Sequence, residues 1–450
     1  MKKMFFLLSI IITFGEGIVN AQQPKGNILP YQIYQHKLPN GLNVVTVPYD
    51  SPGLAAFYVV MRVGSRDEIE VGKTGFAHFF EHMMFRGTEK YPKEKYSDAL
   101  KATGASANAN TSLDRTLYHM TGNAAMLDKM FELESDRFMN LKYSEQDFKT
   151  EAGAVKGEYT KNSASPYEQL DEKMNDVAFK SHTYQHTTMG FFKDVVDMPN
   201  QYVYSQEFFK RFYKPEYATV IVVGDVKPEA INALAEKYFG VWQKGNFASQ
   251  IPVEPVQTET RYTHVQVPNF PPVVSLNYKA PAYKNNDIEM PALDLLNSIL
   301  FSEKSDLYNK LVVAEQKARS INGGATNSRD PYLSQISASL VDAKDMQYVK
   351  DQIIAAIEKS KTTPVDAKVL SDAKSRLRYS FAMGIDSPTS IAEALSSYVW
   401  VTGDPESINN EYVMYDNVTA QDIMNVAKKY YVTTGLTVAT ISGDASCPVK

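Results

Sequence analysis

The stretch that decides the fold is GFAHFFEHMMF, residues 75–85, in which two histidines and a glutamate interrupt an apolar run. His78 and His82 are four residues apart, so on a helix their rings project from one face. Glu81 falls beside the same pair. Buried imidazoles and carboxylates need partners, because burying polar groups without them is costly. A bound metal ion supplies such a partner, so the stretch predicts a metal site.

The flanking residues set the limits of this helix. Thr74 is a good N-cap and Gly87 a good stop, so the pattern predicts a helix over 75–86. Two histidines four apart give zinc two ligands on one rigid scaffold, and the adjacent glutamate can reach a metal-bound water. This is the H-x-x-E-H arrangement, the reverse of the H-E-x-x-H zinc motif. The motif therefore indicates a catalytic zinc site that needs one more ligand.

A candidate third ligand lies in a second predicted helix over 144–162. Ser144 is its N-cap and Asp147 completes a capping box. Glu151 and Glu158 are seven residues apart on one face of this helix, and either could reach a metal. The residues alone do not choose between them.

The chain contains a degenerate internal repeat. The alternating strand and turn at 54–68 resemble those at 270–287, and the strand ending in Gly-Asp at 218–231 resembles that at 436–446. Both pairs are separated by close to 218 residues. Each copy alternates strands with amphipathic helices, which predicts two homologous α+β domains, each an antiparallel-rich sheet packed with helices. The proline-containing, polar segment 243–260 has the composition of a linker.

The N-terminus has the pattern of a secretory signal. Lysines at positions 2 and 3 precede a short apolar run and a small-residue cleavage site, so residues 1–21 are predicted to be a signal peptide. The apolar run is too short to span a bilayer, and none that could do so follows. We therefore expect an exported protein, most simply in a bacterial periplasm. Its predicted domains are 22–250, which binds the metal, and 251–450, which does not.

Charge and cysteine content exclude other classes. The formal net charge is -5 and no basic run or basic aromatic face is present, so nucleic acid is not an expected partner. Cys447 is the one cysteine of the chain, which rules out an intrachain disulfide.

Four segments resemble one known family. GFAHFFEHMMFRGTEKY is followed, 76 positions after His82, by Glu158 in EAGAVKGEY. LPNGLNVVTVP at 38–48 and GASANANTSLDRTLYH at 104–119 resemble that family's first strand pair and its active-site edge strand. The chain resembles the pitrilysin, insulysin and mitochondrial processing peptidase family of inverted zinc peptidases, in its half-size, two-domain branch. The resemblance implies two domains that face each other across a cleft.

The resemblance also implies roles for the residues of the motif. His78, His82 and Glu158 match the zinc ligands, which would hold one Zn²⁺ per chain. Glu81 matches the general base that activates a zinc-bound water. Glu151 matches a carboxylate that supports the ligands from outside the metal's coordination sphere.

The same resemblance implies how a substrate binds. Asn108, with Ala109 next to it, matches the strand that pairs with an extended substrate. Such pairing adds the substrate to a sheet as a further strand, with affinity from main-chain hydrogen bonds. The implied function is that of an exported zinc-dependent endopeptidase acting on extended peptides or unfolded segments.

The second copy departs from the family pattern. No histidine follows His264, so this copy is not expected to bind zinc. The family's inactive half usually contributes an arginine and a tyrosine, and the aligned positions here are Val312 and Arg319. We therefore expect a homodimer, or a heterodimer with a related subunit that supplies the Arg/Tyr pair. The alternative is a non-catalytic structural or assembly subunit of a larger peptidase-like complex.

Overall fold

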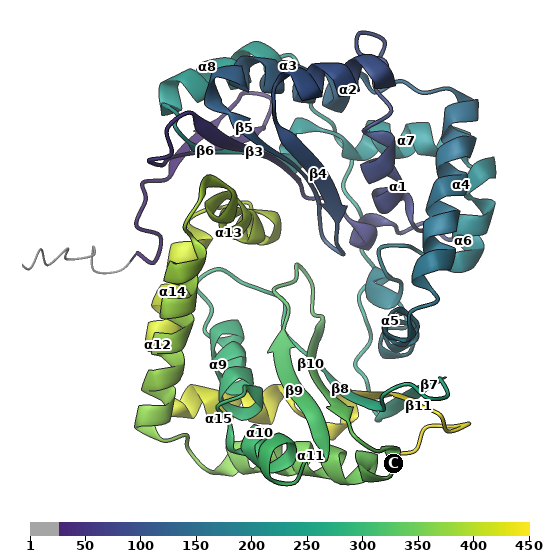
Figure 1. The fold of residues 1–450 in the computed structure, drawn as a ribbon, viewed down its shortest axis with the longest axis vertical. Coiled ribbons are helices and arrows are strands. Elements are labelled where there is room, and N and C mark those ends of the chain that lie inside the picture. The colour runs from purple at the N-terminus through teal and green to yellow at the C-terminus, as the bar shows by residue number, and fades with distance from the viewer. Residues whose placement is uncertain (1–26) are drawn as a thin grey trace, which may run out of the picture.

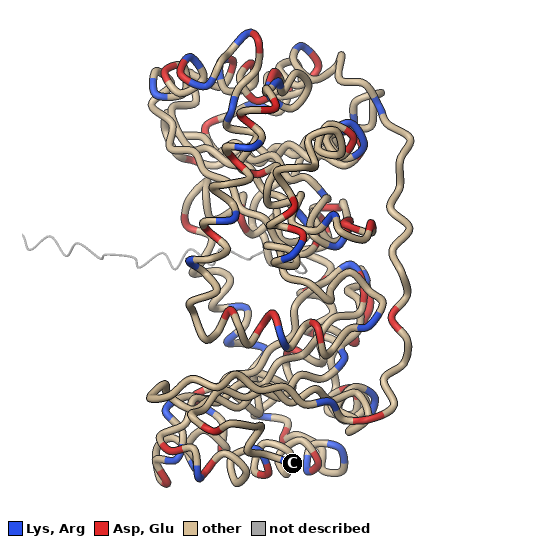
Figure 2. The backbone as a smooth tube through the Cα atoms, turned by 90° about the vertical axis from the view of Figure 1, so that its right-hand side faces the viewer, with Lys and Arg blue, Asp and Glu red and all other residues tan. Residues whose placement is uncertain are grey.

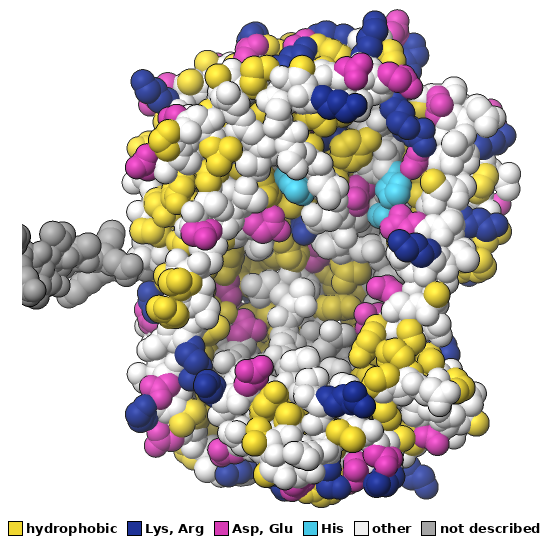
Figure 3. Space-filling model, viewed as in Figure 1, with side chains coloured by type: hydrophobic (Ala, Val, Ile, Leu, Met, Phe, Trp, Pro, Cys, Tyr) yellow, Lys and Arg dark blue, Asp and Glu magenta, His cyan; other side chains and the backbone are white. Residues whose placement is uncertain are grey.

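The computed structural model describes residues 27–450, so the predicted signal peptide lies outside the described residues. Two β-sheets, each with its own helices, lie one above the other along the long axis of the molecule (Figure 1). The space-filling view shows a hollow between the two halves (Figure 3). The predicted α+β class, with two similar domains facing each other across a cleft, is confirmed.

The first sheet has six strands in the order β1-β2-β6-β3-β5-β4. Its neighbours are antiparallel except for β2 and β6, which are parallel. Every residue of β6 is buried, because the strand lies inside the sheet and both of its faces are covered. The strands are β1 (Tyr34–Lys37), β2 (Asn43–Pro48), β3 (Leu54–Met61), β4 (Ser106–Thr111), β5 (Thr116–Asn123) and β6 (Ala218–Gly224).

The second sheet repeats this arrangement without the first strand. Its order is β7-β11-β8-β10-β9, again with one parallel pair, β7 and β11. The strands are β7 (Arg261–Gln266), β8 (Val273–Lys279), β9 (Ala318–Ala325), β10 (Leu333–Leu340) and β11 (Leu436–Ser442). In this order β8 takes the place of β3 and β11 that of β6, the two correspondences that the repeat predicts.

Helices surround each sheet. Those of the first half are α1 (Phe76–Met83), α2 (Lys93–Ala102), α3 (Leu127–Asn140), α4 (Glu145–Asn162), α5 (Pro166–Ala178), α6 (Phe192–Asp197), α7 (Tyr202–Phe212) and α8 (Pro228–Phe239). Those of the second half are α9 (Glu289–Phe301), α10 (Asp306–Tyr308), α11 (Met346–Thr362), α12 (Ala367–Gly384), α13 (Pro388–Thr402), α14 (Ser407–Asn417) and α15 (Ala420–Tyr430). Within residues 27–450, no helix has the length and apolar character that a bilayer crossing requires.

The two halves exchange one helix each. Helix α5 of the first half packs on β7 and β11 of the second sheet, and α13 of the second half packs on β3 and β6 of the first (Figure 1). Leu170 and Met174 of α5 are buried with Val273 and Ile441 of the second sheet. Burial of one such side chain stabilises the fold by about 1.5–3 kcal/mol. The sheet of each half is therefore covered on one face by a helix from the other half.

The connection between the halves is extended. Residues 243–260 contain no helix or strand. This segment runs along the outside of the molecule from the upper half to the lower (Figure 2). The domain limits 22–250 and 251–450 stay a prediction.

Candidate metal centre

The start of helix α1 is capped by a side chain outside the helix. The prediction that Thr74 caps this helix is wrong, because its hydroxyl donates to Asp194 Oδ2 at 2.7 Å. Instead Glu68 accepts the N–H groups of Gly75 and Ala77, one at each carboxylate oxygen and both at 2.7 Å. A carboxylate suits this position, because the free N–H groups there carry partial positive charge. Burial raises the pKa of Glu68 to about 8, while these two hydrogen bonds act to lower it.

The predicted limits of the two helices fare differently. Helix α1 ends at Met83, three residues short of the prediction, and Gly87 follows with a φ of +95°. The capping box of α4 is confirmed: Ser144 Oγ accepts the N–H of Asp147, and Asp147 Oδ2 accepts the N–H of Ser144, each at 3.1 Å. Helices α1 and α4 pack against each other, which brings their polar faces together.

Three predicted ligands meet between these helices. The ligand atoms of His78, His82 and Glu158 all lie within 4.8 Å of one another. Glu158 Oε2 is 3.8 Å from His78 Nε2 and 3.3 Å from His82 Nε2. Two imidazole nitrogens and one carboxylate oxygen form a donor set that zinc accepts in catalytic sites. Within residues 27–450, this is the one His, Cys, Asp and Glu group with such spacing.

Glu151 lies on the other side of His82. Its Oε1 is 3.0 Å from His82 Nδ1, and its Oε2 accepts a hydrogen bond from Arg86 Nε. If Nδ1 donates this bond, the lone pair of Nε2 is left for a metal. Burial acts to raise the pKa of Glu151, but the hydrogen bonds from His82 and Arg86 outweigh it and lower the pKa. No pattern in the sequence indicates that Arg86 would hold this carboxylate.

The electrostatics of the histidines also fit a metal. Burial, followed by the neighbouring His82, lowers the pKa of His78 to about 4, so that imidazole is neutral at physiological pH. His78 Nδ1 is buried and has no hydrogen-bond partner among residues 27–450. A neutral imidazole can donate its lone pair to a cation, whereas an imidazolium cannot.

The side chain of Glu81, on α1, contacts the end of strand β4. Its Oε2 accepts a hydrogen bond from the hydroxyl of Thr111, the last residue of β4, at 2.5 Å. Burial raises the pKa of Glu81, and the bond from Thr111 opposes that effect. Thr111 lies in a stretch that resembles the family, but its contact with Glu81 joins distant segments and cannot be read from the sequence.

Asn108 and Ala109 lie on β4, an edge strand of the first sheet (Figure 1). Asn108 is exposed and lies opposite His119 of β5, whereas Ala109 is buried against the core beneath the sheet. Histidines appear in cyan on the upper half in Figure 3, beside the hollow. The exposed side chains of β4 lie on the face of the sheet opposite to that core. The outer edge of β4 has no strand partner among residues 27–450, so β4 offers an edge for strand pairing.

The second half holds no counterpart of the three ligands. Helix α9 includes the segment 294–297, the position expected to correspond to His78, and places Asp294 and Leu295 there. Val312 lies in a short helical segment before β9, and Arg319 is an exposed residue of β9. The missing Arg/Tyr pair stays a prediction.

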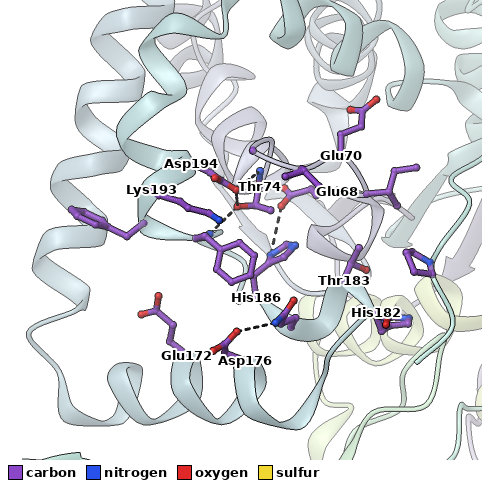
Figure 4. Close-up of a pocket in the computed structure, with 18 of the residues that line it drawn as sticks. Glu68, Glu70, Thr74, Glu172, Asp176, His182, Thr183, His186, Lys193 and Asp194 are labelled. Atoms are coloured by element: carbon purple, nitrogen blue, oxygen red, sulfur yellow. Dashed lines mark hydrogen bonds and ion pairs between the residues drawn. The ribbon is translucent and has the colours of Figure 1, made fainter. Parts of the chain in front are cut away.

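A separate cavity of about 830 Å³ lies behind the start of α1. Figure 4 shows His186 and Asp194 beside Glu68, with Glu172 and Asp176 of α5 across the open space. His186 Nδ1 is 3.8 Å from Glu68 Oε2. None of the three predicted metal ligands lines this cavity, which instead borders the carboxylate that caps the metal-site helix.

Comparison with known proteins agrees with the fold. The family model described as "Insulinase (Peptidase family M16)" matches residues 44–190, and the model "Peptidase M16 inactive domain" matches residues 205–377. The chain belongs to peptidase family M16.

Individual relatives match over almost the whole chain. The "Zinc protease PqqE" of Helicobacter pylori is 28% identical over 440 residues, which are 96% of each chain. A crystal structure of a protease from Helicobacter pylori superposes with a TM-score of 0.85 at 27% identity, covering 92% of this chain and 99% of that one. An M16-like peptidase from Alicyclobacillus acidocaldarius shares the fold, with a TM-score of 0.81 at 17% identity over 92% and 98% of the two chains.

Proposed function

We propose that the chain is an exported, zinc-dependent endopeptidase that cleaves extended peptides or unfolded segments, with Glu81 as the general base. The observation that carries the proposal is the convergence of His78, His82 and Glu158 within 4.8 Å, with Glu81 on the same helix. The names of the M16 relatives, which include zinc proteases, support a peptidase.

The three converging side chains would hold one zinc ion. When bound, zinc acts as a Lewis acid that polarises a carbonyl and lowers the pKa of a water ligand to about 7. Glu151 would keep His82 oriented, with Arg86 holding Glu151 in turn.

Glu81 would handle the protons of the reaction. Its carboxylate accepts the proton of the attacking water and returns it to the leaving amine. A base works best when its pKa lies near the operating pH, and burial shifts the pKa of Glu81 in that direction. The carboxylate projects from the same helix as the two histidines, so base and ligands are positioned together.

The substrate would lie along β4. Asn108 and Ala109 belong to a strand with an open edge, and pairing there demands an extended backbone rather than a particular side chain. A folded protein does not present such a strand, so the preferred substrates are peptides and unfolded segments.

The proposal is tested with a quenched extended peptide. The purified protein should contain one zinc per chain and lose cleavage when a chelator removes the metal. Glu81→Gln should retain zinc and lose activity, because Gln cannot accept the proton. A zinc-loaded wild-type protein that cleaves no peptide, even with its natural partners present, would favour the non-catalytic subunit.

Two further parts of the proposal concern the assembly and the compartment. The aligned positions Val312 and Arg319 do not supply an Arg/Tyr pair, so we propose a dimer in which a related subunit supplies it. Co-purification from the native host, with assays of the chain alone and of the complex, tests this. Sequencing the N-terminus of the exported protein tests the proposed cleavage after residue 21 and the periplasmic location.

A further inference from the structure

The end of strand β4 makes direct contact with the proposed base. Thr111 Oγ1 donates to Glu81 Oε2 at 2.5 Å, across 30 residues of sequence. No hydrogen bond within residues 27–450 engages the other carboxylate oxygen of Glu81. One oxygen is thus held while the second is left for chemistry.

The alternation of β4 explains why this residue reaches α1. Ala109 and Thr111 are two apart and point to the same face of the sheet, and Ala109 is buried in the core that includes α1. Asn108 and Asn110 are exposed and point to the opposite face. Strand β4 therefore has an open edge and exposed asparagines on one face. On the opposite face it directs the hydroxyl of Thr111 toward Glu81.

The hairpin turn after Thr111 is anchored from several directions. Asp114 in this turn accepts the hydroxyl of Tyr184 at 2.7 Å and the N–H of Arg329, from the second half, at 2.9 Å. A Cβ on Gly64 would lie 2.4 Å from the carbonyl oxygen of Leu113, so the neighbouring loop packs tightly on the turn. These contacts fix the turn, and the turn fixes the position of Thr111.

We propose that Thr111 is the positioning residue of the base: its hydroxyl holds Glu81 in the reactive orientation and ties that orientation to the strand on which an extended peptide would pair. This inference rests on the proposed function. Thr111 does not touch the metal ligands in this arrangement, and it acts on the reaction through Glu81. A peptide that pairs with β4 would steady the strand and, through this bond, the base.

The test compares Thr111→Val, which removes the hydroxyl and keeps the shape, with Thr111→Ser, which restores it. Thr46→Val is the matched control, because Thr46 is a buried strand threonine of the same sheet. Its Oγ1 has no hydrogen-bond partner in the described part of the chain. Loss of a hydrogen bond to a charged group should lower kcat of Thr111→Val by about tenfold to a hundredfold. We expect KM and zinc affinity to stay within about twofold, because neither the open edge nor the ligands change.

Thr111→Ser should recover kcat to within about threefold of wild type, and Thr46→Val should match wild type. The inference is overturned if Thr111→Val keeps the wild-type kcat, or if Thr111→Ser falls as far as Thr111→Val. It is also overturned if the loss appears in zinc affinity instead of kcat.

A structural readout decides the same point without an assay. Crystal structures of zinc-loaded wild type and Thr111→Val should show the Glu81 carboxylate displaced or in several orientations only in the variant. An unmoved carboxylate in Thr111→Val contradicts the inference. A wild-type protein that binds zinc but cleaves no peptide, even with its natural partners present, contradicts the proposed function instead, so the two failures are distinguishable.

Discussion

The second half of the molecule contains a carboxyl pair that should make its stability depend on pH. The hydroxyl of Tyr415 lies 2.7 Å from Asp294 Oδ2 and 3.1 Å from Glu411 Oε1. A hydroxyl has one proton to donate, and a proton on one of the carboxyls would complete the second short contact. Burial, followed by repulsion from Glu411, raises the pKa of Asp294 to about 8, and burial also raises the pKa of Glu411.

The perturbation that exposes this proton is Asp294→Asn, which mimics the neutral acid. The folded pKa of about 8 lies above the reference value of 3.8, so between these limits the folded state holds a proton that the unfolded state has lost. The free energy of unfolding of the wild type must then fall as pH rises, by up to about 1.4 kcal/mol per pH unit. Between about pH 6 and about pH 7.5 the loss approaches about 2 kcal/mol, and Asp294→Asn should lack it.

The assay is urea unfolding followed by circular dichroism at several pH values in this window. Comparing Asp294→Asn with wild type cancels the pH dependence of the metal site, which both proteins share. Asp50→Asn, at an exposed position, is the control and should run parallel to wild type. Because the two carboxyls titrate as a pair, the measured slope belongs to the pair. Parallel curves for Asp294→Asn and wild type would refute a proton held by this pair of carboxyls.

Three other predictions concern the metal site and the exchanged helix. Glu151→Gln should weaken zinc binding by about tenfold, measured by competition with a chromogenic chelator, because it removes the carboxylate that orients His82; unchanged affinity would mean that Glu151 does not act through that ring. Glu68→Ala should destabilise the protein by about 1–2 kcal/mol in urea unfolding, because two N–H groups at the start of α1 lose their acceptor; a fall of a few tenths would show that water replaces it. Leu170→Ala should lower the free energy of unfolding by about 3 kcal/mol, since this side chain is buried between α5 and the second sheet. Glu168→Ala, at an exposed position on the same helix, is the control and should leave it unchanged. Equal effects would argue against the packing of α5 on that sheet.

Local sequence patterns and the internal repeat predict much of the fold and of the candidate site. The spacing of His78, Glu81 and His82 is a property of one short helix, so the sequence alone reveals it. The capping box at Ser144 is local as well, and the structure has it. The offset of about 218 residues predicted two similar α+β halves, because both copies keep the strand pattern that builds the same sheet.

Tertiary structure decided what depends on contacts between distant segments. The residues left Glu151 and Glu158 equivalent, and the packing of α1 on α4 separates them: Glu158 faces both Nε2 atoms and Glu151 faces Nδ1 of His82. Thr74 was misread as a cap because Glu68, seven residues before Gly75, folds back onto the helix. Local rules see only neighbours along the chain, so a donor or acceptor that arrives through space lies beyond them.

The exchange of α5 and α13 has the same origin. Each helix has an apolar face that its sequence shows, but nothing in that face says which of two similar sheets it will cover. An apolar sheet face exposed to water is unfavourable, so a helix must cover it. Which helix does so depends on which one the connections of the folded chain allow to reach that face. The sequence by itself thus determined the halves and the candidate ligands, and the tertiary structure determined how the halves interlock and which side chains support the site.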